Sequence, residues 1–574
     1  MTRRRRLSGL LAACMLLFYL SGCGKQEASA SAPASFGDAV DSAESALEPV
    51  VSQPVTTTGV FSMPYNSGYG WDPYNCKSME NQAVMQLIYQ GLFTMNASFD
   101  PEPVLCKEYT VSDDGLTYTI TLQNATFSNG SSVTASDVVY SLSQASDSEL
   151  YDSRFTDIAS YEASGTDTVI LYLSSPNDRL PCLLNFPIIP NLSSAASGPV
   201  GSGPFVRNGD VLTKSQNWWQ GANTVQFQTV TLYSSASAED TRDNFEMDNI
   251  HFVYNNPNSA SAASFHCDYE LWNSKNTVMQ YMGFNLSAGI CSDKDIRTAI
   301  IRAIDRTEIA ESVYHNFADP TELPVAPTSS MYDEALARDY QYDADAALEH
   351  LLKSSSFYLP EDDPRRKNGP GAQREAAVDS TQADATVDST VDEPPADAGN
   401  AEADTAVTSP QPSPDQTENT VAYNEITMLV LSGSLSRSAA AKLAAGYLED
   451  VGFTVNIQTL GEDDFISTIN AGEFDLYYAD VCLTPDMDLR PLLLSDGSLN
   501  YSFIPPDSTL EAHMDSALEN SGNRYDLYQY VMNQGYICPV LFENNAVFTT
   551  RGVFTGLNPA PGNLFYQIEN ITVQ

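Results

Sequence analysis

Alternating apolar and polar residues mark a β-hairpin early in the chain. Residues 109–112 and 116–122 alternate on either side of Asp114-Gly115, and an Asp-Gly pair between two such runs is typical of a hairpin turn. A helix is predicted soon after it. It begins at Thr134, whose hydroxyl and the carboxylate of Asp137 are spaced to form a capping box.

The second half of the chain has the apolar spacing of an α/β unit. Isoleucines at positions 296, 300, 301 and 304 recur at helical intervals, and Asp305 to Glu308 offers a second capping box. The pattern then predicts a helix, a strand, a helix and a strand over residues 439–448, 453–459, 465–470 and 474–478. This alternation favours a partly parallel sheet covered by helices.

The first residues resemble an export signal that ends in a lipid-attachment site. Arg3 to Arg6 precede an apolar stretch that is too short to span a membrane as a helix. It ends in Leu20-Ser21-Gly22-Cys23, which looks like a bacterial lipobox, so we expect residues 1–22 to be removed and Cys23 to carry lipid. Two acyl chains anchor a protein firmly. The alternative is an ordinary signal peptide with a cysteine there by chance.

Two polar stretches with few large apolar residues are expected to stay disordered. Residues 23–58 are rich in Ala, Ser, Glu and Pro and are interpreted as a tether. Residues 361–420 have no aromatic residue, Leu or Ile, and predicted elements flank them. We therefore expect an insertion in a surface loop. The remaining chain is longer than one hydrophobic core usually holds, so it predicts two or three domains.

Charge and cysteine content exclude several classes of protein. Removal of residues 1–22 leaves 24 basic and 74 acidic residues, a net charge of about −50, so nucleic acid is a poor partner. Of nine cysteines, Cys14 lies in the signal and Cys23 is the anchor. The seven others have irregular spacing and no CxxC pair, so they predict no disulfide framework and no metal site. Cys76 with Cys106 is the pair to test first.

No catalytic motif stands out. The histidines do not form an HExxH pair, and the chain has no P-loop and no Gly-rich dinucleotide fingerprint. The sequence therefore predicts no enzyme, no cofactor and no bound metal. A secreted hydrolase is the weakest of the alternatives.

A series of short motifs, in order along the chain, carries a resemblance to a known family. Gly201-Ser202-Gly203-Pro204-Phe205 is similar to a Gly-Thr-Gly-Pro-Tyr element, and Asn217-Trp218-Trp219-Gln220-Gly221 to its Asn-x-Tyr-Trp-x-Gly partner. The other segments lie at residues 87–93, 100–105, 114–118, 127–130, 134–142, 282–286, 297–306 and 472–476. Together they make the chain resemble the bacterial extracellular solute-binding proteins of family 5, the peptide and nickel class.

This resemblance implies an α/β, two-lobed fold like that of periplasmic binding proteins, with an extra α+β domain inserted in the first lobe. Ligand is expected between the lobes, which close by a hinge motion. The expected boundaries are 59–75 and 185–284 for lobe I, 76–184 for the extra domain, 285–360 and 421–500 for lobe II, 361–420 for the insertion, and 501–574 for the return to lobe I and the C-terminus.

The resemblance also implies a ligand site drawn from three segments. Lys77, Ser78 and Met79 are expected to offer backbone hydrogen bonds to an extended peptide; the alternative is a solvated loop. Tyr151 falls where the family has a cleft aromatic. The third segment comprises Val481, Cys482, Thr484 and Asp486.

The third segment departs from the family pattern. Peptide binders carry Gly-Trp and then an aspartate for the ligand's amine, whereas an ungapped count places Val481 and Thr484 there. An unpaired buried ammonium is costly. Either Asp486, after a small shift, or Asp480 pairs with the amine, or the ligand has no free amine.

The function implied is capture of a small ligand, expected to be an oligopeptide, in the cleft between the lobes for an ABC importer. The expected partners are the ligand, the permease subunits and the membrane, which a monomer reaches through its lipid anchor on the extracytoplasmic face of the cell membrane. A lipid-anchored ligand sensor of the same fold is the alternative, because it needs the same capture domain.

Overall fold

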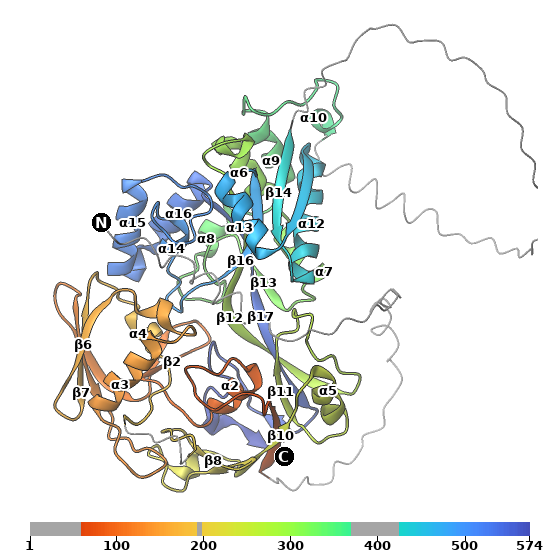
Figure 1. The fold of residues 1–574 in the computed structure, drawn as a ribbon. Helices are drawn as coiled ribbons and strands as arrows, with labels where there is room; N and C mark the ends of the chain where they lie inside the picture. Colours follow the sequence, from red (N-terminus) through yellow and green to blue (C-terminus); the bar gives the residue numbers. More distant parts are fainter. Residues whose placement is uncertain (1–58, 192–197, 369–423) are drawn as a thin grey trace, which may run out of the picture.

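The computed structural model describes residues 59–191, 198–368 and 424–574 (Figure 1). The predicted signal, the tether and most of the predicted insertion lie outside these residues. Within them the chain forms two lobes, with a smaller extra domain beside the lower lobe in the view of Figure 1. No helix in the described ranges combines the length and the apolar character that a membrane crossing requires.

Two long antiparallel strands, β12 (Tyr269–Phe284) and β17 (Ile537–Thr550), run from one lobe into the other. They pair from Tyr269 with Thr550 to Gly283 with Ile537. Their sheet has the order β11-β17-β12-β16-β14-β15, and β13 pairs with β17. The other strands are β11 (Phe252–Asn255), β13 (Ala318–Pro320), β14 (Glu425–Leu431), β15 (Thr454–Leu460) and β16 (Leu476–Cys482).

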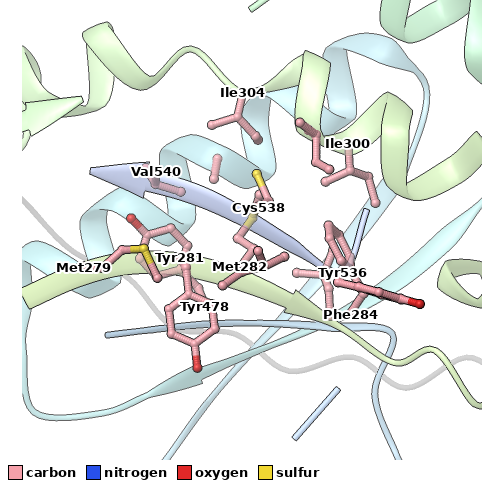
Figure 2. Packing of buried hydrophobic residues seen from close by; sticks show 14 of the residues in the cluster. Met279, Tyr281, Met282, Phe284, Ile300, Ile304, Tyr478, Tyr536, Cys538 and Val540 are labelled. Carbon is pink, nitrogen blue, oxygen red and sulfur yellow. The ribbon is translucent and has the colours of Figure 1, made fainter. Parts of the chain in front are cut away.

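Lobe II surrounds the far half of these strands. Here β14 is parallel to both β15 and β16, as the α/β pattern predicted. The helices that cover this sheet are α6 (Lys294–Ala303), α7 (Arg306–Ser312), α9 (Ala344–Leu351), α12 (Leu435–Val451) and α13 (Glu462–Ala471). Figure 2 shows Ile300 of α6 and Ile304, which follows that helix, near Met282, Cys538 and Val540. Burial of such apolar side chains is the main source of the lobe's stability.

The return to lobe I comes later than predicted. Helices α15 (Ser508–Glu519) and α16 (Arg524–Gln534) bury Leu510, Met514 and Val531 in the core of lobe II. The chain re-enters lobe I only within β17, not at residue 501. The apolar face of each helix packs in lobe II. The local sequence pattern predicts the apolar face but not the lobe against which it packs.

Lobe I and the extra domain each have a core of their own. Lobe I contains a sheet of order β1-β10-β9-β8, formed by β1 (Val60–Tyr65), β10 (Thr229–Ser234), β9 (Val211–Lys214) and β8 (Phe205–Asn208). β1 is parallel to β10, and the other neighbouring strands are antiparallel. The extra domain has the antiparallel order β4-β5-β7-β6. Its elements are β4 (Cys106–Val111), β5 (Thr117–Leu122), α3 (Ala135–Ser146), β6 (Ile158–Ser164) and β7 (Thr168–Leu173).

Local predictions for the extra domain are confirmed. Strands β4 and β5 form the expected hairpin, with Gly115 in the left-handed region at φ +71°. At the start of α3 the Asp137 carboxylate accepts from the Thr134 backbone N–H at 2.8 Å, and the capping box is complete. Both features depend on neighbouring residues alone.

The described cysteines are all free, namely Cys76, Cys106, Cys182, Cys267, Cys291, Cys482 and Cys538. The proposed pairing of Cys76 with Cys106 is therefore wrong. Cys76 packs in the core of lobe I and Cys106 in that of the extra domain. Each behaves as a small buried apolar side chain.

A pair of hydrogen bonds joins the segment around Tyr358, which precedes residues 369–423, to Asn424, which follows them. The Asn424 side chain accepts from the Tyr358 backbone N–H at 2.9 Å and donates to the Tyr358 carbonyl at 2.6 Å. We call this contact the Tyr358–Asn424 clasp. It lies in lobe II, and its Asn424 directly precedes β14 in the sequence.

Two sequence motifs that the resemblance singled out pack against each other. The Gly203 N–H donates to the Ile88 carbonyl at 2.8 Å, and the Phe205 N–H donates to the Leu87 carbonyl at 3.1 Å. A Cβ at Gly201 would overlap the Ile88 carbonyl oxygen, and one at Gly203 would lie 2.7 Å from it. These positions require glycine because two backbone segments meet there.

We expect Gly201→Ala to destabilise the protein by about 1–3 kcal/mol, because the overlapping atoms belong to backbone that cannot rotate away. Chemical denaturation followed by circular dichroism measures this. Gly446→Ala is the matched control. Gly446 lies in α12 with open space around its Cα, so alanine should stabilise by about 0.5–1 kcal/mol. Equal stability of the two variants would contradict the proposed backbone contact.

Candidate ligand cavity

A cavity of about 610 Å³ lies between lobe I and the extra domain. Helix α2 (Met79–Met85), strands β2 (Phe93–Met95) and β3 (Pro101–Pro103), and the segment from Leu150 to Arg154 contribute to its walls. Residues 562–569 near the C-terminus close it. Lobe II contributes no side chain to this lining, so the cavity lies on one side of the predicted cleft.

Aromatic side chains with a hydrogen-bonded polar end form much of the wall. Trp218 is 8% exposed, and its indole N–H donates to the Ser202 carbonyl at 3.0 Å. Tyr254 accepts from the Asn545 side chain at 2.7 Å. Such rings supply contact area at a low cost in conformational entropy. The cavity therefore combines apolar surfaces with fixed polar groups, as small-molecule sites usually do.

One arginine projects from the extra domain into this cavity. The guanidinium of Arg154 lies 4.8 Å from the centroid of the Tyr151 ring, and it donates to the side-chain oxygen of Asn185. Desolvation lowers the pKa of Arg154 and raises the pKa of Tyr151. Both side chains nevertheless keep part of their surface accessible. Both side chains therefore lie in the wall of a cavity that opens to solvent.

The extra domain touches lobe II directly next to this arginine. Arg490 donates to both carboxylate oxygens of Asp157 at 3.0 and 2.5 Å, and its Nε donates to Asp488 at 3.0 and 2.9 Å. Nearby, the Asn177 side chain donates to Asp486 at 2.9 Å. Planar, two-oxygen pairing of this kind is geometrically specific. We call these contacts the domain–lobe latch.

The level at which β12 and β17 pass between the lobes is polar. Residues 273–275 of β12 lie opposite residues 544–546 of β17, and the register shifts between Lys275 and Met279. Gln280 donates to the buried Glu543 carboxylate at 2.6 Å, and burial raises the pKa of Glu543. A stretch without apolar packing separates the two cores, which suits a hinge.

Of the predicted site residues, Tyr151 lines the cavity. Cys482 and Asp486 come from lobe II, and the negative charge of Asp486 opposes the lowering of the Arg154 pKa. Val481 pairs with Met279 within the β12–β16 ladder, and Thr484 has a buried hydroxyl with no hydrogen-bond partner among the described residues. These four residues of lobe II approach the cavity but do not line it.

The segment from Lys77 to Met79 differs from the predicted extended edge. Ser78 caps α2 by accepting from the Asn81 N–H at 3.2 Å, and Met79 is already helical. Lys77 forms an ion pair with Glu149 at 2.7 Å. The serine oxygen satisfies a free N–H of the first helical turn, so the chain turns into a helix here instead of offering a strand.

The two aspartates considered for a ligand amine differ in their surroundings. Asp480 forms an ion pair with Arg437, which already satisfies its charge. Asp486 is 1% exposed and uses one oxygen for Asn177, while its other oxygen has no hydrogen-bond partner among the described residues. Asp486 is therefore the better placed of the two.

Sequence reasoning missed Arg154, Glu102, Asn185 and Tyr254, as well as the C-terminal segment. Arg154 follows the predicted Tyr151 by three residues and is one of only 28 basic residues in a strongly acidic chain. The small number of basic residues was the one feature of the sequence that could have pointed to Arg154. The others come from distant segments that only the fold brings together. Among the described residues no group of three or more His, Cys, Asp or Glu is arranged to hold a metal ion.

Comparison with known proteins agrees with this architecture. A family model for bacterial extracellular solute-binding proteins, family 5 Middle, matches residues 100–500. The glutathione-binding protein GsiB of Escherichia coli K12 is 27% identical over 306 residues, which are 50% of this chain and 59% of GsiB. The chain thus matches less than two thirds of the length of these curated relatives.

Solved structures confirm the predicted two-lobed α/β fold. The ABC transporter substrate-binding protein CtaP from Listeria monocytogenes has a TM-score of 0.63 at 16% identity, with 90% of this chain and 100% of CtaP covered. A nickel ABC transporter protein from Bacillus halodurans has a TM-score of 0.64 at 16% identity, with 88% and 98% covered. At these identities the likeness shows the fold alone.

Asp157→Asn tests the domain–lobe latch. It removes the charge from a paired, largely covered carboxylate, so we expect the contact to weaken by about 1.5–3 kcal/mol and the radius of gyration in small-angle X-ray scattering to rise. Arg338→Gln is the control, since it breaks an exposed pair with Glu334 inside lobe II. An unchanged scattering curve for Asp157→Asn would show that the latch does not hold the lobes together.

Proposed function

Because the chain belongs to family 5 of the bacterial extracellular solute-binding proteins, we propose that it captures a short peptide or a peptide-like solute and delivers it to an ABC importer. The family binds solutes and does not transform them. The observation that carries the proposal is a cavity of about 610 Å³ beside a contact between two hinged parts of the chain. Small-molecule sites span roughly 300–1,000 Å³.

Hinge motion gives this arrangement a mechanism. A ligand that touches the Arg154 side of the cavity and the nearby lobe II segment around Asp486 binds one lobe arrangement better than the other. It shifts the population toward that arrangement by its difference in affinity. The importer then recognises the loaded shape. The polar level of β12 and β17 is the proposed place of the bend.

The peptide assignment rests on the chemistry of the walls together with the relatives. Glutamine and asparagine side chains, among them Gln86, Gln90 and Asn185, face the cavity and can both donate to and accept from amide groups. GsiB is named as a glutathione-binding protein, and glutathione is itself a tripeptide. Asp486, with one buried oxygen left over, is the proposed partner of a ligand amine.

Mass spectrometry of the small molecules released from the purified protein tests this proposal directly. We expect peptide-like species of a few residues. Re-addition of the identified species at 100 times its dissociation constant should stabilise the protein by about 2.7 kcal/mol, seen as a rise in melting temperature. Release of a nickel complex or a sugar instead would contradict the peptide assignment and leave the binding role intact.

The proposed location is the extracytoplasmic face of the cell membrane, with Cys23 as the lipid-bearing residue. We expect Cys23→Ala to move the protein from the membrane fraction to the soluble fraction in cell fractionation, because the acyl anchor is lost. Cys267→Ala, at a partly exposed cysteine of the folded part, is the control and should leave the distribution unchanged. Retention of Cys23→Ala in the membrane fraction would contradict the anchor.

A further inference from the structure

Glu543 is a buried carboxylate at the level where β17 passes between the lobes. It is 8% exposed and lies opposite Ala318 of β13. The described lining of the cavity does not include it. Gln280 of the neighbouring strand β12 donates to one of its oxygens at 2.6 Å. A charged carboxylate in such a place is costly unless a positive charge compensates it.

The charged side chains around Glu543 are engaged with other groups. Arg437 acts on it through space, but its nitrogens donate to Asp480 and to two backbone carbonyls. On the side of β12 and β13, Lys275 is paired with Asp319 at 2.6 Å. A proton is then the simplest positive charge that can neutralise this carboxylate.

Two tyrosines complete the surroundings of Glu543. Tyr314, which follows α7, and Tyr478 of β16 both lie near it. Burial raises the pKa of each hydroxyl, so both tyrosines stay neutral over the range in which carboxylates titrate. They neither compensate a charged Glu543 nor take up its proton.

The Gln280 side chain offers a place for a proton on Glu543. Its amide N–H binds one carboxylate oxygen, whereas its own oxygen is buried and has no hydrogen-bond partner among the described residues. A protonated carboxyl accepts at one oxygen and donates from the other, which matches the donor and the acceptor of the amide. The neutral carboxyl can therefore form a cyclic pair with Gln280 that satisfies both groups.

Segments from both lobes cover this carboxylate. Asn256, which follows β11 in lobe I, hydrogen-bonds to Glu543. From lobe II, the Ser436 hydroxyl of α12 donates to the Asn258 carbonyl at 3.3 Å. The Asn258 side chain donates to the Phe317 carbonyl at 3.2 Å. A change in the angle between the lobes therefore alters this cover and lets water reach the carboxylate.

The acidity of Glu543 follows the cover. Burial raises its pKa in the lobe arrangement of this structure, whereas a hydrated glutamate has a pKa of about 4.3. A group with two pKa values binds or releases a proton as the arrangement changes. The buried arrangement favours the neutral form, so it becomes more populated as the pH falls from the raised value toward about 4.3, by up to about ten-fold per pH unit.

We infer that Glu543 is a proton-dependent switch at the hinge, which binds a proton when the lobes are arranged as in this structure and releases it when they turn apart. A falling pH favours this arrangement, and a rising pH favours separation of the lobes. The switch does not depend on the identity of the solute, so it can fail while the proposed function stands.

Small-angle X-ray scattering of the ligand-free full chain between about pH 5 and about pH 8 tests the switch. We expect the radius of gyration of the wild type to rise with pH. Glu543→Gln should lose this part of the response, because its amide keeps the donor of the protonated acid and never ionises. Glu334→Gln, at an exposed carboxylate of α8 (Glu334–Arg338), is the matched control and should respond as the wild type does.

Other carboxylates, those of the domain–lobe latch included, titrate in all three proteins. The part of the pH response that belongs to Glu543 is therefore the difference between Glu543→Gln and the wild type. An equal rise of the radius of gyration in these two proteins would overturn the switch.

The melting temperature gives a second readout. A charged Glu543 destabilises the fold above its raised pKa, and this cost vanishes below about pH 4.3. Glu543→Gln should therefore melt about 2 °C or more above the wild type near pH 8, and close to it near pH 4. A carboxylate that serves only as an acceptor for Gln280 would instead give a lower melting temperature for the variant at both pH values, and that result overturns the switch.

If Glu543→Gln does not fold, infrared difference spectra of the wild type decide. Isotope-labelled glutamate separates Glu543 from Asp488, whose pKa is also raised by burial. A labelled carboxylic acid band that persists well above pH 4.3 supports the switch, because exposed glutamates are ionised there. Labelled carboxylate bands alone would overturn it.

Discussion

The fold depends on one constraint. Strands β12 and β17 belong to both lobes, but both strands are polar where they pass from one lobe into the other. Along β12 the polar residues 273–277 separate Trp272, which packs on lobe I, from Met279 in the core of lobe II. Along β17, Glu543 to Asn545 occupy the same level. The strands are therefore the natural place for a bend. The lobes also touch elsewhere, because Met95 and Phe99 of the β2–β3 segment are buried in the core of lobe II.

Arginine placement follows from this division of the chain. Most buried arginines donate hydrogen bonds to backbone carbonyl groups where helices end or strands turn, and so satisfy these acceptors. Arg490 instead ties the extra domain to lobe II. Arg154 does neither, because it donates to the Asn185 side chain and lines the cavity between lobe I and the extra domain.

The sequence was informative where structure depends on near neighbours. The hairpin at Gly115, the capping box at Thr134, the helix cap at Asp305 and the alternation from 439 to 478 needed only a few adjacent residues each. The lobe that receives α15 and α16, the helix start at Ser78 and the cavity wall at Tyr254 and Tyr566 depend on contacts between segments hundreds of positions apart. No local pattern contains that information, and so Tyr151 was found while Arg154 and Glu102 were not.

The Tyr358–Asn424 clasp has a consequence for how this protein can change over generations. Because two side-chain hydrogen bonds already join the flanking ends, the length and composition of the segment between them place little demand on the rest of the fold. Lobe II can accept a new sequence, a repeat expansion or a whole domain at that point without a change in the packing of its core. The surface of lobe II can change at such a position while the core of the lobe stays the same.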